Sequence, residues 1–481
     1  MRILLSLIAF LSLGQTFKNK DFDLVISNPK IINVEDGTIL LNHDILIKGN
    51  IITAIVLHSN NYERSIKIID ASNQYAVPGL WDMHVHALNK GYFEFSNPLM
   101  VANGITGFRD TWGGLLFADT VRKKMQTGEI AFQRFILSGN LIDGAEKIWR
   151  NSQEAATPQR GIELVDSFYK KGAGFIKVYS RLTPETFTAI AKRCKELNIK
   201  FAGHVPQKVK LIDASNAGMY SMEHLYGMTE AFSDIEDSIF QVADKINFAS
   251  GDTAVRSRLV AERQGMLLRS KTVPEKVKKV SEVLISNNTW IVPTLLVLRG
   301  FYYMDVLEKV KDDRFDFLPF PMTDGWKVIN NFGTSGRPPQ YWINAKIRYQ
   351  KNIEDLGLLN KNKVPLLAGT DFPNPYCIPG FGLHDEFELM NKAGLTPLEV
   401  LRSATLNPAK YLDKTDSLGT IAANKYADIL LLSENPLTSI SNTRKIEGLV
   451  VNGKFYNKSE LEKLKQKAKD ISQKMNPRPK N

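Results

Sequence analysis

Cysteine and histidine are scarce in this 481-residue sequence. Only Cys194 and Cys377 are present, which excludes the disulfide framework that holds many small secreted domains together. Cys194 falls in an amphipathic helical stretch, PETFTAIAKRCKELN, so we expect two independent free thiols. Histidine occurs only seven times, and each position is therefore informative.

Long apolar runs are also missing, since none reaches the ~20 residues that a transmembrane helix needs. The run from Ile3 to Leu13 follows a single arginine and precedes small residues, the layout of a secretory signal peptide over residues 1–14. We expect the protein to be exported, to the periplasm or beyond the cell, and its mature chain to lack a membrane span.

The net charge of +11 raises the possibility of an acidic partner, but its distribution weakens that interpretation. The basic C-terminal tail, residues 458–481, has eight basic and three acidic residues. A basic surface helix is favoured there over a nucleic-acid-binding arm, and an oligomer contact stays open. No aromatic-rich basic motif of an RNA-binding module is present, so we expect no nucleic-acid partner.

Two patterns of hydrophobicity divide the chain. Residues 22–79 and 413–457 have short β-type runs broken by turns, and we expect the two segments to form one small β-sandwich. Residues 80–412 alternate short apolar runs with helical segments, which indicates an α/β barrel of parallel strands buried on both faces. Residues 229–348 exceed one βα unit, and we predict one strand near 290–297 plus helical insertions that form a lid.

The histidines fall at the ends of predicted barrel strands. His84 and His86 lie two apart in GLWDMHVHA, so both side chains point to the same face of a strand. His204 and His224 each close an apolar run, at the carboxyl-terminal face where such barrels hold their active sites. A core histidine bonded to a backbone carbonyl explains any one of them, but not four at strand ends.

Two charged residues occupy buried strand positions. Asp371 closes the apolar run VPLLAGT, where an acid is costly unless it is paired or metal-bound; a helix N-cap is the alternative. Lys177 lies inside FIKVYS and needs either a counter-charge or the loss of its own charge. Carboxylation by CO2 would make it an anionic oxygen ligand, whereas a barrel carboxylate would pair with it unmodified.

These residues and their surroundings resemble the amidohydrolase superfamily, in its imidazolonepropionase-like and Xaa-Pro (Xaa-Arg) dipeptidase branch. The resemblance runs from about Asp23 to Tyr456. Its motifs, in chain order, are VPGLWDMHVH, GITGFRD, FIKVYS, AGHVP, MEHL, LLAGTD, LHDEFELMNKAGLTPLEVLRSATLNPAKYL and SLGTIAANKYADILLLSENPL. The fold that it implies is a (β/α)8 TIM-like barrel with the small sandwich.

The resemblance also implies a site for two divalent metal ions, with zinc suited to the imidazole and carboxylate ligands. His84, His86 and Asp371 would hold the more buried ion. His204 and His224 would hold the second, and carboxylated Lys177 would bridge both. Asp371 and His224 would also act in catalysis, as proton carrier and oxyanion donor.

Three further residues are weaker candidates for substrate binding. Arg109 in GFRD is a possible carboxylate anchor, although a structural pair with Asp110 explains it equally well. Tyr226, two residues after His224, is placed to donate to a carbonyl unless it only packs. His384 begins a helix after the last ligand and is as consistent with orienting a loop as with touching substrate.

The expected activity is hydrolysis of an amide bond in a dipeptide or short peptide by a metal-activated water. The same site would also serve a cyclic amide, a lactone or an N-acyl compound, because loops rather than ligands set the substrate. Deaminases of the superfamily carry Glu where this chain has Gln207, which disfavours deamination. A non-catalytic binding protein is disfavoured by the intact set of ligands, and self-association stays open.

Overall fold

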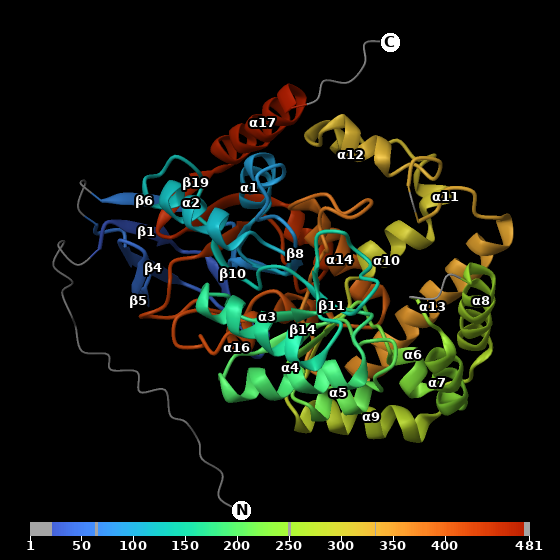
Figure 1. Ribbon diagram of the computed structural model, residues 1–481. Helices are drawn as coiled ribbons and strands as arrows, with labels where there is room; N and C mark the ends of the chain where they lie inside the picture. The colour runs from blue at the N-terminus through green and yellow to red at the C-terminus, as the bar shows by residue number, and fades with distance from the viewer. Residues whose placement is uncertain (1–21, 63–65, 249–251, 332, 476–481) are drawn as a thin grey trace, which may run out of the picture.

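The computed structural model describes residues 22–62, 66–248, 252–331 and 333–475, and a barrel lies beside a layered β-sheet region (Figure 1). The signal peptide predicted over residues 1–14 lies outside the described residues. No helix in the described part is long and apolar enough to cross a membrane.

Short parallel strands form the barrel, as the alternation of apolar runs and helices predicts. Apart from residues 134–136, which are half-buried, their residues are buried, because helices and the barrel interior cover both faces. The named strands, in chain order, are β8 (Leu80–Val85), β9 (Ile105–Asp110), β10 (Arg134–Leu137), β13 (Ile176–Val178), β14 (Phe201–Gly203), β15 (Ser221–Glu223) and β16 (Trp290–Val292). Two short strands, β11 (Ile142–Asp143) and β12 (Gln153–Glu154), extend the sheet beside β13.

Residues 364–371 close the barrel between β16 and β8. The Leu367 amide donates to the Ile291 carbonyl at 2.9 Å, and the Met83 amide donates to the Ala368 carbonyl at 2.9 Å. The Gly174 amide donates to the Leu137 carbonyl at 2.8 Å and so joins β10 to the chain entering β13. These bonds confirm a closed barrel, with the eighth strand made by the segment that ends at Asp371.

Local sequence starts several of the surrounding helices. A threonine N-cap followed by proline begins α3 (Pro158–Lys170), α4 (Pro184–Glu196) and α15 (Pro397–Ser403). The threonine hydroxyl satisfies a free amide of the first turn, and proline has no amide to leave unsatisfied there. The other helices of the barrel region are α1 (Phe93–Ala102), α2 (Leu115–Gln126), α5 (Leu211–Asn216), α14 (Phe381–Lys392) and α16 (Leu406–Tyr411).

Residues 229–348 contain β16 and a series of helices, as predicted. Before β16 lie α6 (Met228–Phe232), α7 (Glu236–Lys245), α8 (Thr253–Arg269) and α9 (Pro274–Ser286). After it come α10 (Leu295–Tyr302), α11 (Met304–Leu307), the 3-10 helix η1 (Asp313–Phe317), α12 (Phe320–Gly325) and α13 (Pro339–Lys361). Figure 1 shows α8, α11, α12 and α13 together on the right of the barrel. We call the helices from α6 to α13 the insertion helices; the strand β16 is not counted among them.

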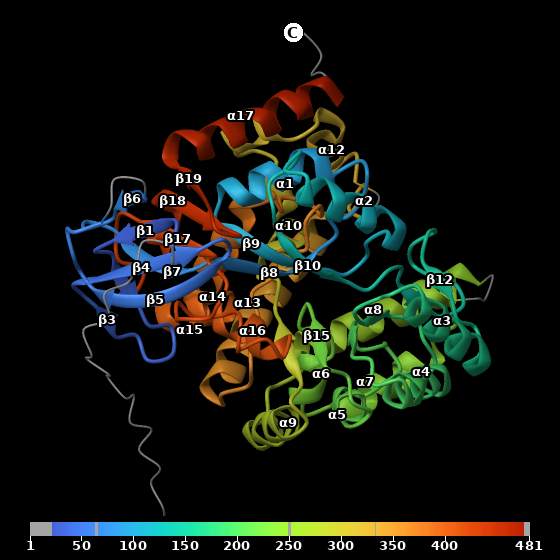
Figure 2. The same ribbon diagram turned by 90° about the vertical axis from the view of Figure 1, so that its left-hand side faces the viewer.

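The two flanking segments form two sheets, confirming the β-sandwich. One has the order β5-β4-β1-β6 and the other β19-β18-β17-β7-β2-β3 (Figure 2). Antiparallel pairing of Val77 with Leu430 joins the N-terminal to the C-terminal segment. The strands are β1 (Leu24–Ser27), β2 (Lys30–Ile32), β3 (Ile39–Leu40), β4 (His43–Lys48), β5 (Ile51–Leu57), β6 (Lys67–Asp70), β7 (Tyr75–Pro78), β17 (Ile429–Leu432), β18 (Ile446–Val451) and β19 (Lys454–Asn457); the 3-10 helix η2 (Ile440–Arg444) precedes β18.

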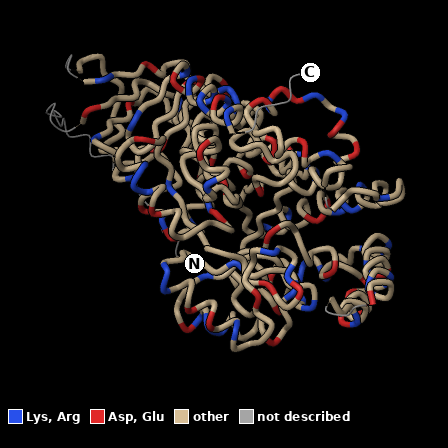
Figure 3. The backbone as a smooth tube through the Cα atoms, turned by 45° about the horizontal axis from the view of Figure 1, so that its top comes forward, with Lys and Arg blue, Asp and Glu red and all other residues tan. Residues whose placement is uncertain are grey.

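The basic tail forms α17 (Lys458–Met475), an amphipathic helix packed on α1 and η1. Leu461 and Ala468 are buried against these elements, and the Ser472 hydroxyl donates to the Phe317 carbonyl at 2.6 Å. Figure 3 shows both signs of charge spread along the chain. Both cysteines are free and buried, as expected.

Candidate metal centre

A cavity of about 1540 Å³ opens at the carboxyl ends of the barrel strands. Strand ends and insertion helices both contribute to its lining. All six residues expected to bind metal line it: His84, His86, Lys177, His204, His224 and Asp371.

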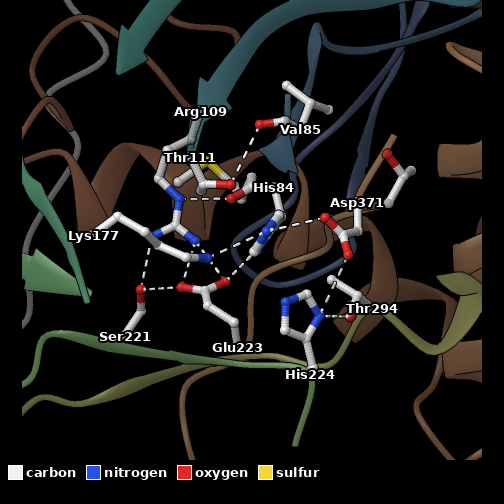
Figure 4. A network of polar contacts seen from close by, with 12 residues as sticks. His84, Val85, Arg109, Thr111, Lys177, Ser221, Glu223, His224, Thr294 and Asp371 are labelled. Carbon is white, nitrogen blue, oxygen red and sulfur yellow. Dashed lines mark hydrogen bonds and ion pairs between the residues drawn. The ribbon is translucent and has the colours of Figure 1, made fainter. Parts of the chain in front are cut away.

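The carboxylate of Asp371 faces His84 and His224 (Figure 4). Its Oδ1 atom lies 3.3 Å from His84 Nε2 and 2.8 Å from His86 Nε2, although no described residue donates an aligned hydrogen bond to it. Lys177 Nζ lies 3.4 Å from His84 Nε2. The Nε2 atoms of His84 and His86 converge on one buried carboxylate oxygen, so these donors fit a divalent metal ion.

The remaining two histidines continue the same cluster. The ring centres of His84 and His224 are 4.7 Å apart, and those of His204 and His224 are 4.8 Å apart. Ligand atoms of His84, His224 and Asp371 all lie within 4.8 Å of one another. Burial lowers the pKa of His224 to about 3 and holds that of His204 well below its usual value. Both imidazoles are therefore neutral near pH 7, the form that binds metals.

Each of the four imidazoles is oriented by a neighbouring side chain through Nδ1. Such a partner selects the tautomer and the ring orientation of a metal ligand. The pairs are His84 with Glu223 Oε2 at 2.7 Å, His86 with Thr111 Oγ1 at 3.3 Å, His204 with Ser180 Oγ at 2.8 Å and His224 with Thr294 Oγ1 at 2.6 Å.

Arg109 holds the side chain of Glu223 in place. The Arg109 guanidinium donates to both carboxylate oxygens of Glu223, at 2.8 and 2.9 Å, and both side chains are fully buried. Burial by itself would raise the pKa of Glu223, but Arg109, His84 and Lys177 together outweigh it and the pKa lies below its ordinary range. Glu223 is therefore a permanent anion behind His84.

Arg109 does not line the cavity, in contrast to the substrate contact considered for it. Its remaining hydrogen bonds go to the Met83 carbonyl, Ser221 Oγ and the Tyr411 hydroxyl. Its ionic partner is Glu223 rather than Asp110, whose carboxylate accepts backbone amides instead. The role that the structure supports for Arg109 is structural.

Lys177 has no ion pair with a carboxylate of any described residue, which disfavours the paired-lysine alternative. Its side chain is 1% exposed, and burial lowers its pKa to about 8. The nearest polar group that contacts it is the candidate ligand His84.

The backbone is strained at two of the candidate ligands, His224 and Asp371. His224 has φ of 63° and Asp371 has φ of 64°, in the left-handed region that side chains rarely occupy. Asp82 holds the second turn in place, because it accepts from the Thr370 amide at 3.0 Å and from the Thr370 hydroxyl at 2.7 Å. Strain that the surroundings hold in place is typical of functional sites.

The other two weaker candidates for substrate binding, Tyr226 and His384, lie in different places. Tyr226 lines the cavity, with its ring centre 4.8 Å from that of His204. His384 lies on α14 outside the cavity, where it bonds to Thr443 Oγ1 at 2.9 Å and to the Asn103 carbonyl at 3.0 Å. It is therefore positioned to tie α14 to its neighbours and not to meet a substrate.

Sequence reasoning missed Glu223, Thr294 and the cationic wall residue Arg348. Glu223 closes a buried apolar run, so the argument applied to Asp371 would have found it. Thr294 and Arg348 belong to the insertion, where no pattern in the sequence points to the cavity.

Comparison with known proteins gives the same family over most of the chain. The sequence pattern described as "Amidohydrolase family" matches residues 75–456. An adenine deaminase of Listeria monocytogenes serotype 4b (strain F2365) is 41% identical over 86 residues, which is 18% of this chain and 14% of that protein. The curated relatives are thus matched over only a small part of their own length.

Solved structures match over a much larger part. A Xaa-Pro dipeptidase with bound methionine in its active site has a TM-score of 0.64 and 19% identity, covering 90% of this chain and 99% of that one. A bottromycin amidohydrolase has a TM-score of 0.71 and 20% identity, covering 93% and 90%. At these identities the likeness is one of fold.

Proposed function

The chain belongs to the amidohydrolase family of metal-dependent hydrolases that act on C–N bonds, and on this basis we propose that it cleaves the amide bond of a dipeptide or short peptide. The observation that carries the proposal is the convergence of His84, His86 and Asp371 at the mouth of the barrel. The dipeptidase among the similar folds supports the peptide class.

The donor set supports two divalent cations, for which zinc is our proposal. His84, His86 and Asp371 would hold one ion and His204 and His224 the other, with carboxylated Lys177 between them. Such ions supply a water of lowered pKa and polarise a carbonyl oxygen. No carboxylate of the described residues forms an ion pair with Lys177, which supports carboxylation: it would replace the buried cation by an anion that the metal ions balance.

The protein's own residues would then handle the proton and orient the substrate. Asp371 would accept the proton of the attacking water on its cavity-facing carboxylate and return it to the leaving nitrogen. Tyr226, whose ring centre is 5.3 Å from that of His224, would donate its hydroxyl to the negative charge that develops on the carbonyl oxygen, and His224 would act there through the ion that it holds. Glu223 and Thr294 would keep His84 and His224 in the required orientation.

The signal-peptide pattern of residues 1–14 supports a site of action outside the cytoplasm. An exported enzyme of this kind meets peptides rather than the intermediates of an intracellular pathway. Peptide scavenging is therefore the role that we propose.

The experiment is elemental analysis of purified wild type, Lys177→Ala and the exposed control Lys171→Ala, each assayed on a dipeptide library. About two ions per chain in the wild type, with metal and activity both reduced in Lys177→Ala only, is the expected result. One ion or none, unchanged by Lys177→Ala, would overturn the bridged site. No cleavage of any dipeptide by metal-loaded wild type would overturn the peptide class.

A further inference from the structure

The insertion helices bring a cation to the cavity that the proposed hydrolysis does not use. Arg348 of α13 lines the cavity together with Tyr226 and Tyr302. Its helix is tied to the chain that follows His224, because the Thr229 hydroxyl donates to Asp355 Oδ2 at 2.7 Å. Arg348 therefore has a defined position relative to the candidate metal ligands.

The carboxylates of the cavity are already committed to other groups. Among the described residues that line it, Glu230 and Asp371 are the carboxylates. Glu230 forms an ion pair with Arg263 at 2.7 Å, and Asp371 faces the imidazoles. One arginine thus remains without an anionic partner.

That arginine is Arg348, which donates to the neutral side chain of Gln264. No ion pair joins it to a carboxylate of any described residue. An arginine keeps its charge at all ordinary pH values, and a charge withdrawn from water is costly until an anion meets it. A planar guanidinium also matches a carboxylate with two parallel hydrogen bonds.

The position of Arg348 suits the far end of a small substrate. Tyr226, which lines the cavity together with Arg348, has its ring centre 5.3 Å from that of His224. Arg348, Tyr226 and Tyr302 line the same cavity, and Tyr302 raises the pKa of Arg348 against the effect of burial.

We infer that Arg348 binds the free carboxylate of the residue on the leaving side of the scissile amide, so that the preferred substrates are short peptides with an unblocked C-terminus. This inference rests on the proposed amide hydrolysis.

The test pairs each dipeptide that the wild type cleaves with its C-terminal amide. Wild type is expected to prefer the free acid by roughly 10- to 100-fold in kcat/KM, the range for a charge-assisted hydrogen-bonded pair. Arg348→Met is expected to lose that preference, because the acid is slowed more than the amide. The exposed Arg337→Met is the matched control and keeps the preference.

A second measurement does not depend on turnover. Binding of the C-terminal amino acid product, and of its amide, is measured by calorimetry on metal-loaded wild type, Arg348→Met and Arg348→Lys. The acid is expected to bind more weakly to Arg348→Met and to recover in part with lysine. Equal affinity of wild type for acid and amide would overturn the inference even if Arg348→Met did not fold.

The two proposals fail separately. If the wild type cleaves dipeptides but treats acid and amide alike, the carboxylate site is overturned and the hydrolase stands. If no amide is cleaved at all, the proposed function is overturned first, and the binding measurement still decides whether Arg348 recognises a carboxylate.

Discussion

The two walls of the cavity are built in different ways. At the strand ends each imidazole has its Nδ1 bonded to a neighbouring side chain, and Glu223 is held by Arg109. The insertion helices carry groups with spare capacity, of which Arg348 is the clearest. The difference suggests a division of labour, in which the barrel holds the reaction centre rigid and the insertion helices select what reaches it.

The largest effect that tests this contrast is expected from Asp371→Asn. The change keeps the shape of the side chain but removes the charge that faces His84 and His86, so we expect kcat/KM to fall by roughly 1000-fold or more and metal content to fall with it. The equivalent change on the insertion side, Glu230→Gln, is expected to lower kcat/KM by less than about 10-fold. Equal losses in steady-state assays would contradict the division of labour.

Arg109→Met should reveal the rigidity of the barrel side through stability. It leaves Glu223 as a buried, uncompensated anion, a change that costs about 3–5 kcal/mol of unfolding free energy. Arg263→Met leaves Glu230 at the cavity wall with its side chain 6% exposed, whereas Glu223 is fully buried, and we expect a smaller loss. Denaturant unfolding of both variants measures the difference, and a larger loss in Arg263→Met would reverse the comparison.

Thr294→Val tests the orientation of a single ligand. It keeps the branched shape but removes the hydroxyl that bonds His224 Nδ1 at 2.6 Å. Loss of such a partner weakens metal binding or activity by about 10- to 100-fold. Metal affinity is measured by competition with a chelator, with the exposed Thr188→Val as control. Unchanged affinity would mean that His224 is oriented by its backbone instead.

The smallest effect is a pH dependence on the insertion side. Burial raises the pKa of Asp355 to about 7 from its ordinary 3.8. Between these values the folded chain retains a proton that the unfolded chain releases, so this group lowers stability as pH rises. Asp355→Asn removes the effect, and its stability relative to wild type should increase by roughly 1–2 kcal/mol from about pH 5 to about pH 7.

Thermal melting at the two pH values measures this increase. Asp213→Asn, on the exposed side of α5, is the control and should follow the wild type at both. A difference between Asp355→Asn and wild type that does not change with pH would show that Asp355 is ionised in the folded chain.

Much of the barrel side was predictable from the chain itself. Apolar runs that end in histidine or aspartate place polar atoms at one end of a parallel barrel, since all its strands point the same way. The pairing of the two flanking β segments was predicted for another reason: neither alone has enough strands to be stable. The pattern of apolar runs could not predict that Arg109 would lie beneath the site, because its partner Glu223 is 114 residues away and only the closed barrel brings them together.

The insertion side was predictable only as a series of helices. Hydrophobic periodicity indicates that a helix forms and which face is apolar, but not where its polar residues lie relative to a distant strand. Arg348 comes from a 23-residue helix whose place is set by packing and by the Thr229–Asp355 bond. The sequence around Thr229 gives no sign of a contact with Asp355, and the sequence around Asp355 gives no sign of a contact with Thr229.

The sequence by itself determined the types and order of the candidate ligands, the alternation of strand and helix and the threonine-proline starts of several helices. These depend on residues that are neighbours in the chain or share one period of a strand or helix. The tertiary structure decided which side chain orients each imidazole, which carboxylate pairs with each arginine and which cation is left for a substrate. Those outcomes depend on contacts between distant residues, whose distances are defined only when the barrel closes and the insertion helices pack against it.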